Sequence, residues 1–206
     1  MFVLGVDPGL TRCGYGCVEQ RGRIQKAVAA GVIATPPSMP LPERLAELQR
    51  EFKALLAELR PDEVAIERVL FQVNVRTAMS VGQASGVLMA ESVNAGCSVT
   101  EYSPNEVKEA VAGWGAAPKA QVERMVQTIL GIDQPLRPVD ASDAIAIALC
   151  HLARRSRVTR HVASSSTHPA AGFLLDDATC RGTRERRARW HSAIAMASDA
   201  STGRSG

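Results

Sequence analysis

The sequence lacks the features that define several common classes of protein. Its five cysteines, Cys13, Cys17, Cys97, Cys150 and Cys180, are odd in number and form no CxxC pair, so neither a zinc site nor a disulfide framework is indicated. The four histidines also lack metal-ligand spacing. No apolar run approaches the length of a membrane span, and the N-terminus has no basic segment followed by a long apolar stretch. We therefore expect a soluble, cytoplasmic protein with reduced cysteines and no membrane partner.

A strong charge of either sign is also absent, because the formal net charge is only +3. Residues 154–206 carry ten Arg, no Lys and four acids, whereas residues 1–153 carry fourteen basic and seventeen acidic residues. A mildly acidic body is unexpected for a protein that binds a polyanion, unless its acids gather in one place and divalent cations neutralise them. The length of 206 residues suits one domain, at 1–155, and an Arg-rich tail at 156–206 that we expect to be disordered.

Apolar patterning in the first 155 residues predicts an α/β domain with five strands and several helices. The unbroken apolar run that starts the chain is typical of a strand buried on both faces of a sheet. Two moderately apolar segments then form a hairpin. Strands are predicted at 2–6, 14–20, 23–35, 63–67 and 98–102, and helices at 43–60, 75–94, 103–112, 118–130 and 140–152.

Acidic residues stand where predicted strands end and where the last predicted helix begins. Asp7 ends the first strand and Glu67 ends the fourth, while Asp140 and Asp143 share one helical face. Ordinary explanations exist: Asp7-Pro-Gly suits a turn, and the two helix acids suit a cap and the helix dipole. Together, however, four close carboxylates would repel unless divalent cations shared them, and all-oxygen ligands favour Mg²⁺ or Mn²⁺. Two such ions about 4 Å apart can promote phosphodiester hydrolysis.

Several separated motifs resemble, in order, those of the RuvC family of Holliday junction resolvases. They span residues 1–153 and are Asp7-Pro-Gly-Leu-Thr-Arg-Cys-Gly-Tyr-Gly, Ala65-Ile-Glu-Arg-Val, Gly82-Gln-Ala-Ser-Gly86, Val107-Lys108, Lys119-Ala-Gln-Val and Asp140-Ala-Ser-Asp-Ala-Ile-Ala-Ile-Ala. The resemblance implies a ribonuclease-H-like fold, a five-stranded mixed sheet flanked by helices. It also implies an endodeoxyribonuclease that resolves four-way DNA junctions in recombination and repair by two symmetric cuts.

The same resemblance implies a catalytic site, a cofactor and partners. The catalytic metal ligands would be Asp7, Glu67, Asp140 and Asp143, holding two Mg²⁺ per site, for which Mn²⁺ would substitute. A homodimer would place two such sites on the two symmetric strands of the junction. The family's usual protein partners are the RuvA and RuvB branch-migration proteins.

Three basic residues are candidate contacts to DNA. Lys119 lies in the first turn of a predicted helix, where a cation opposes the helix dipole, and a facing phosphate would explain that cost. Lys108 falls where the family has a DNA-contacting lysine, and Arg76 is a further phosphate-binding candidate. The alternative for each lysine is an ordinary solvated surface position.

Two other stretches leave alternatives open. In the family, an aromatic residue three positions past the strand-end Glu often wedges into the opened junction; here Leu70 holds that position and Phe71 follows it. Either side chain could part or stack on bases, or the loop could anchor on the protein body. Gly82 and Gly86 share one face of the predicted helix 75–94, which suits either tight packing on the sheet or a self-pairing dimer helix.

Three competing functions make different demands on the sequence. An ATP-handling protein of the actin and sugar-kinase type would need a second phosphate loop and a second domain of similar size, for which this chain has no room. A non-cleaving junction-binding protein would lack at least one of the four carboxylates, and all four are present. A related ribonuclease-H-like nuclease that acts on RNA would differ in substrate rather than in sequence pattern.

Overall fold

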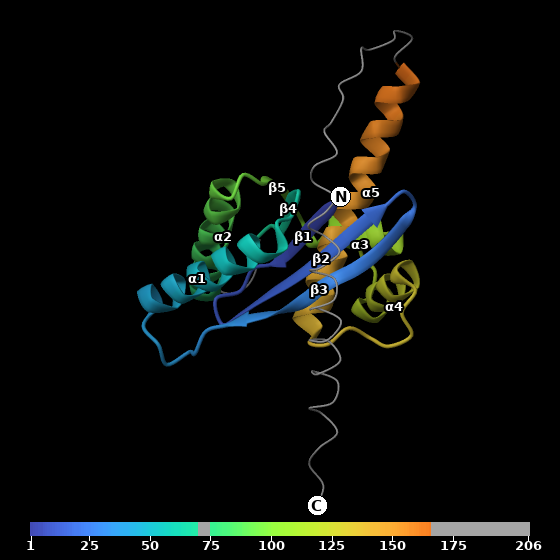
Figure 1. Ribbon diagram of the computed structural model, residues 1–206. Coiled ribbons are helices and arrows are strands. Elements are labelled where there is room, and N and C mark those ends of the chain that lie inside the picture. The colour runs from blue at the N-terminus through green and yellow to red at the C-terminus, as the bar shows by residue number, and fades with distance from the viewer. Residues whose placement is uncertain (70–74, 166–206) are drawn as a thin grey trace, which may run out of the picture. The chain divides into compact units, whose positions relative to one another are not determined.

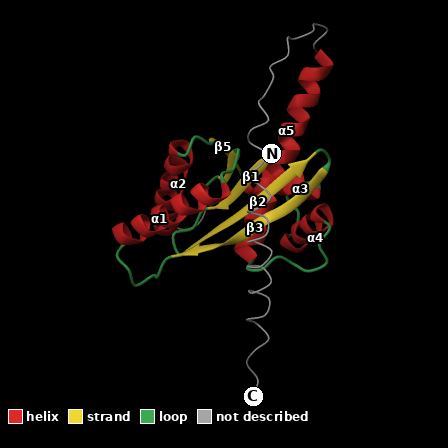
Figure 2. Ribbon diagram, in the orientation of Figure 1, coloured by secondary structure: helices red, strands yellow, loops and turns green. Residues whose placement is uncertain are grey.

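A computed structural model describes the backbone of residues 1–69 and 75–165, and the side chains of residues 1–69 and 78–156. Within these residues five strands form one mixed sheet, in the order β3-β2-β1-β4-β5 (Figure 2). The strands are β1 Phe2–Asp7, β2 Arg12–Arg21, β3 Ile24–Ala34, β4 Glu63–Glu67 and β5 Ser98–Tyr102. The first three strands are antiparallel neighbours, and β4 and β5 continue the sheet parallel to β1. The five predicted strands and the mixed sheet are therefore confirmed.

Five described helices cover the two faces of this sheet. They are α1 Leu41–Leu59, α2 Val75–Asn94, α3 Pro104–Ala112, α4 Lys119–Leu130 and α5 Val139–Ser165. Within the unit formed by Met1–His161, α1 and α2 lie on one face, and α3, α4 and α5 lie on the other (Figure 1). Helix α1 starts two residues earlier than predicted, because Pro42 suits the first turn of a helix. None of these helices is long and apolar enough to cross a membrane.

Helix α5 departs from the predicted boundary of the ordered domain. The apolar period ends near Arg155, so the sequence analysis placed the tail from residue 156, but α5 continues to Ser165. No Pro or Gly interrupts residues 156–165, and extending an existing helix is much easier than starting one. The rest of the predicted tail, residues 166–206, lies outside the described residues.

The central strand β1 is buried on both faces, as its apolar run predicts. Val3 belongs to a core that it shares with residues of α5, including Ile145 and Leu149. Because side chains alternate along a strand, Leu4 and Val6 face the opposite layer, and both are fully buried. Such a strand fixes the position of whatever residue ends it.

Three glycines let α5 lie directly against β1 and β2. A methyl group added to Gly5 would overlap the backbone of Ala144, and one added to Gly16 would overlap Ile145. Added to Gly14, it would overlap the carbonyl of Asp140. The absence of side chains at these positions therefore sets how closely the start of α5 approaches the ends of β1 and β2.

A buried polar chain fixes α5 to the parallel strands further along. The hydroxyl of Tyr102 on β5 lies 3.0 Å from Nδ1 of His151 on α5, and Nε2 of His151 meets the carboxylate of Glu63 on β4. Burial lowers the pKa of His151 and keeps the ring neutral. A neutral ring has one donor and one acceptor, so Nε2 donates to Glu63 and Nδ1 accepts from Tyr102. These contacts hold α5 in one register against β4 and β5.

Candidate active site

Two of the four predicted acids meet at one edge of the sheet. Val6 of β1 is paired in parallel with Ile66 of β4, and each strand ends one residue later, at Asp7 and Glu67. Since side chains alternate, both carboxylates lie on the same face as the core that packs against α5. The sheet register therefore brings Asp7 and Glu67 side by side.

The other two acids come from the first turns of α5. Asp7 is paired with Gly14 of β2, and the carbonyl of Asp140 lies over Gly14, where a side chain would collide with it. Asp140 therefore stands beside Asp7, and Asp143 follows it about one turn later on the same side of the helix. Both aspartate side chains are one-third exposed. Three elements thus contribute acids to one place.

The charges of these acids act on one another. Burial raises the pKa of Asp7 to about 6, and the negative charges of Asp143 and Asp140 contribute to the rise. Burial also raises the pKa of Glu67 to about 7, with contributions from Asp7 and Asp143. Mutual repulsion and burial both disfavour the ionised forms. The raised pKa values mean that the positive charges near these acids do not fully offset burial and the repulsion among their negative charges.

Nearby basic residues supply part of that charge. Lys119, the first residue of α4, donates from Nζ to Oδ2 of Asp143 at 2.7 Å. The positive charges of Lys108 and Lys119 oppose the rise in the pKa of Glu67. Lys119 is thus paired with an acid of the cluster, and this ion pair offsets the unfavourable position of a cation at a helix N-terminus.

Arg12 also belongs to this site, although the sequence analysis assigned it no role. Its Nε and Nη2 donate to Oδ2 of Asp140 at 2.9 and 2.7 Å. The two residues are 128 positions apart in the chain. Only the docking of α5 on β2 brings Arg12 to Asp140, so no pattern local to either residue predicts the pair. Leu70, Phe71 and the side chain of Arg76 lie outside the described residues.

The donor set suits a hard divalent cation. Carboxylate oxygens are the ligands that Mg²⁺ and Mn²⁺ prefer, and a cation would relieve the repulsion that raises the pKa values of Asp7 and Glu67. As the side chains of residues 1–69 and 78–156 stand, no three carboxylate, histidine or cysteine groups are arranged to hold a metal ion. Oδ2 of Asp140 and Oδ2 of Asp143 are each engaged by a basic residue. Binding a cation therefore requires these acids to share or release those partners.

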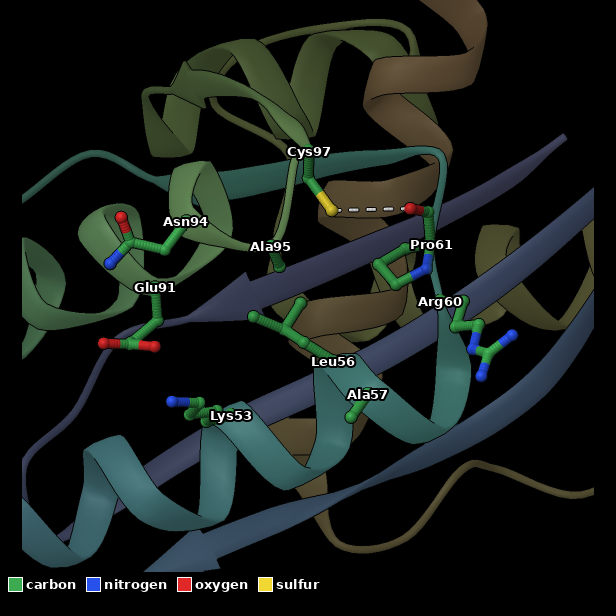
Figure 3. A pocket seen from close by; sticks show the side chains of 9 residues that line it. All are labelled: Lys53, Leu56, Ala57, Arg60, Pro61, Glu91, Asn94, Ala95 and Cys97. Atoms are coloured by element: carbon green, nitrogen blue, oxygen red, sulfur yellow. Dashed lines mark hydrogen bonds between the residues drawn. The ribbon is translucent and has the colours of Figure 1, made fainter.

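A separate hollow of about 700 Å³ lies away from this cluster (Figure 3). It is lined by the C-terminal parts of α1 and α2 and by the segments that precede β4 and β5. Lys53, Arg60 and Glu91 contribute its charged groups, and the thiol of Cys97 donates to the carbonyl of Pro61 at 3.4 Å. Because β4 and β5 begin here and Glu67 ends β4, the hollow lies at the opposite edge of the sheet from the carboxylates.

One side of α2 carries small or apolar residues that face away from the sheet. Methyl groups added to Gly82 or Gly86 would meet no atom of the described part of the chain within 4 Å. Gly86 and Ala90 are exposed, as are Met79 and Val93, at 58% and 62%. Positions 79, 86, 90 and 93 follow the spacing of a helical stripe that meets another helix. Of the two explanations for the glycines, packing on the sheet is therefore wrong.

The raised pKa values predict how the stability of the metal-free protein depends on pH. Asp7 and Glu67 bind a proton more tightly in the folded protein than at their ordinary values of 3.8 and 4.5. Their stabilising contribution is thus fully present below about pH 4 and is lost as the pH rises through about 6 and 7. We expect the free energy of unfolding to fall by roughly 2–4 kcal/mol between about pH 4.5 and 7.5.

Urea unfolding in a metal chelator, at a series of pH values, measures this fall. A double variant, Asp7→Asn with Glu67→Gln, is the control, and its stability should depend much less on pH. A wild-type free energy of unfolding that stayed constant or rose across this range would contradict the prediction. Adding Mg²⁺ at pH 7.5 should restore stability to the wild type but not to the double variant.

Comparisons with known proteins agree with the fold. The family model described as "Crossover junction endodeoxyribonuclease RuvC" matches residues 3–151. A protein of that description from Salinispora arenicola (strain CNS-205) is 50% identical over 166 residues, which cover 80% of this chain and 95% of the relative. Another, from Syntrophomonas wolfei subsp. wolfei (strain DSM 2245B / Goettingen), is 45% identical over 167 residues, covering 81% and 96%.

A solved structure supports the same relationship. The structure of Thermus thermophilus RuvC in complex with a Holliday junction substrate matches this chain with a TM-score of 0.73 and 36% sequence identity. The match covers 77% of this chain and 97% of that one. The predicted ribonuclease-H-like fold is thereby confirmed.

Proposed function

This chain belongs to the RuvC family of Holliday junction resolvases, which are crossover junction endodeoxyribonucleases, and from that premise we propose that Asp7, Glu67, Asp140 and Asp143 are its catalytic metal ligands. The observation that carries the proposal is the meeting of four acids from β1, β4 and α5 at one edge of the sheet. Burial and mutual repulsion there disfavour the ionised carboxylates unless cations bind them. We propose that two Mg²⁺ ions, for which Mn²⁺ would substitute, bind there.

The reaction that this site would perform is hydrolysis of a DNA phosphodiester. Bound Mg²⁺ ions supply activation of the attacking water and stabilisation of the leaving oxygen. The water oxygen forms a bond to phosphorus while the bond to the 3′ oxygen breaks, which leaves a 5′-phosphate and a 3′-hydroxyl. Asp7 and Glu67, fixed at the ends of buried strands, orient the cluster. Lys119 and Lys108, beside Asp143 and Glu67, bind the scissile and neighbouring phosphates.

The substrate we propose is a four-way DNA junction cut by a homodimer. Two supports are independent of the carboxylates: the related Thermus protein is solved with a Holliday junction substrate, and α2 carries an outward stripe that suits a second copy of this chain. A dimer related by two-fold symmetry would apply one site to each of the two symmetric strands. The proposal includes the cytoplasm as the location, the RuvA and RuvB branch-migration proteins as partners, and Arg76 with Leu70 or Phe71 as further DNA contacts.

Cleavage of a synthetic four-way junction with a mobile core tests this function. End-labelled junction, linear duplex and RNA–DNA hybrid of matching sequence are incubated with the wild type in Mg²⁺ and in chelator. We expect paired, symmetric nicks in the junction only, and none in chelator. Junction binding without any cleavage would instead indicate an architectural protein, and cutting of the hybrid would indicate an RNA-directed enzyme.

A further inference from the structure

Arg12 stands at the edge of the sheet where the carboxylates meet. It is the first residue of β2, and its backbone is paired with Ala34 of β3. Pairing between β2 and β1 begins only two residues later, with Gly14 opposite Asp7. Arg12 therefore projects past the end of β1, next to the first turns of α5.

The contact between Arg12 and Asp140 is asymmetric. Both donors of the guanidinium, Nε at 2.9 Å and Nη2 at 2.7 Å, reach the same carboxylate oxygen, Oδ2 of Asp140. The other oxygen, Oδ1, takes no part in this interaction. Two charge-assisted hydrogen bonds to one atom restrict rotation of the carboxylate. The result is an acid with one oxygen held and one oxygen left for another partner.

We propose that Arg12 is a positioning residue that holds Asp140 so that Oδ1 is available to a divalent cation. The inference rests on the proposed function, because it takes Asp140 as a metal ligand. Hydrogen bonds from outside the ligand set orient ligating carboxylates, and their loss typically weakens metal affinity by about 10- to 100-fold. Arg12 supplies such bonds from a strand that contributes no acid to the cluster.

The positive charge of Arg12 opposes cation binding, so two effects compete. The side chain of Arg12 is 51% exposed and that of Asp140 is 33% exposed, so water and salt screen its charge. Screened interactions at such positions change an affinity by about fivefold at most. Orientation of the ligand therefore outweighs repulsion, and removing Arg12 should weaken metal binding.

A substitution of Arg12 tests ligand positioning more directly than a substitution of Lys119, which makes a similar contact with Asp143. Lys119 reaches Asp143 from one donor atom, Nζ, and is also a candidate phosphate contact, so its loss would affect metal binding and DNA binding together. Arg12 directs donors on both Nε and Nη2 at Asp140, and it is not among the predicted DNA contacts, so metal binding and DNA binding can be measured separately for its variants.

Binding of Mn²⁺ to the DNA-free protein, measured by calorimetry or by paramagnetic resonance of free Mn²⁺, tests the inference. We expect Arg12→Gln to raise the Kd by about 10- to 100-fold, and Arg12→Lys to give an intermediate value, because a lysine ammonium can still donate to Asp140 but lacks the two-donor fork of arginine. The matched control is Arg21→Gln, at the other end of β2, where the arginine pairs with Glu19. A Kd for Arg12→Gln that is unchanged or tighter would overturn the proposal.

Junction assays complete the test. Arg12→Gln should need more Mg²⁺ for half-maximal cleavage, while its affinity for the junction in chelator stays within about twofold of the wild type. A tenfold loss of that affinity would make Arg12 a phosphate contact and overturn the proposal. Asp140→Asn separates the two levels of inference: if it does not weaken Mn²⁺ binding, the proposed metal site itself is wrong.

Discussion

Asp7→Asn is expected to reduce junction cleavage by about 10³-fold or more while leaving junction binding in place. Asp7 is the central acid of the cluster, because its charge acts on Glu67 and it is acted on by Asp143 and Asp140. Asparagine keeps the size of the side chain but removes the negative charge that a divalent cation needs. A factor of 10³ corresponds to about 4 kcal/mol of transition-state stabilisation, which is reasonable for loss of a direct metal ligand.

The measurement is a single-turnover cleavage rate on end-labelled junction, with binding followed separately in chelator. Urea unfolding in chelator accompanies it, to show that the variant is folded. Because the ionised form of Asp7 is disfavoured in the folded protein, Asp7→Asn should be at least as stable as the wild type above about pH 6. Cleavage within tenfold of the wild-type rate would remove Asp7 from the catalytic set.

Gly86→Arg is expected to dissociate the proposed homodimer into monomers and to abolish paired cutting. Gly86 lies in the outward stripe of α2, where an added Cβ would meet no atom of the described residues within 4 Å. An arginine there should leave the fold intact, yet place bulk and a repelling pair of charges where two helices would approach closely. We expect the dimer to dissociate at concentrations at least about 100-fold higher than for the wild type, a change of about 2.7 kcal/mol.

Analytical ultracentrifugation measures this change as a shift from the mass of two chains toward the 22.0 kDa of one. Ala54→Arg is the matched control, because Ala54 is an exposed small residue in the middle of α1 and receives the same charge and bulk. The control should remain dimeric and cut both strands. If Gly86→Arg stayed dimeric, or made paired cuts as a monomer, α2 would not be the dimer interface.

The strands along the chain and the acids that end two of them follow from short stretches of sequence. An apolar run that stops at Asp7, and another that stops at Glu67, each predict a buried strand with a carboxylate at its end, because the run and the acid that ends it are adjacent in the sequence. The helical spacing of Asp140 and Asp143 is local in the same way. These patterns, with the motifs between them, were sufficient to predict the fold, the family and four candidate ligands.

The end of a helix is harder to predict from the sequence where no Pro or Gly stops the helix. The last helix was predicted at 140–152 and the end of the domain at residue 155, because the apolar period stops there, but α5 continues to Ser165. Hydrophobic periodicity reports which residues face a core, whereas a helix can extend beyond its core contacts until a Pro or Gly stops it. The periodicity therefore located the packed part of α5 rather than its end.

The sequence by itself determined which residues end the strands, which helix carries the paired aspartates and which family the chain resembles. Only the tertiary structure decided that Gly82 and Gly86 face away from the sheet, and that Lys119 and Arg12 pair with Asp143 and Asp140. The physical reason is that such contacts depend on how closely and at what angle whole elements pack. For α5 that approach is set by glycines on β1 and β2, more than 120 residues away along the chain from the helix they admit.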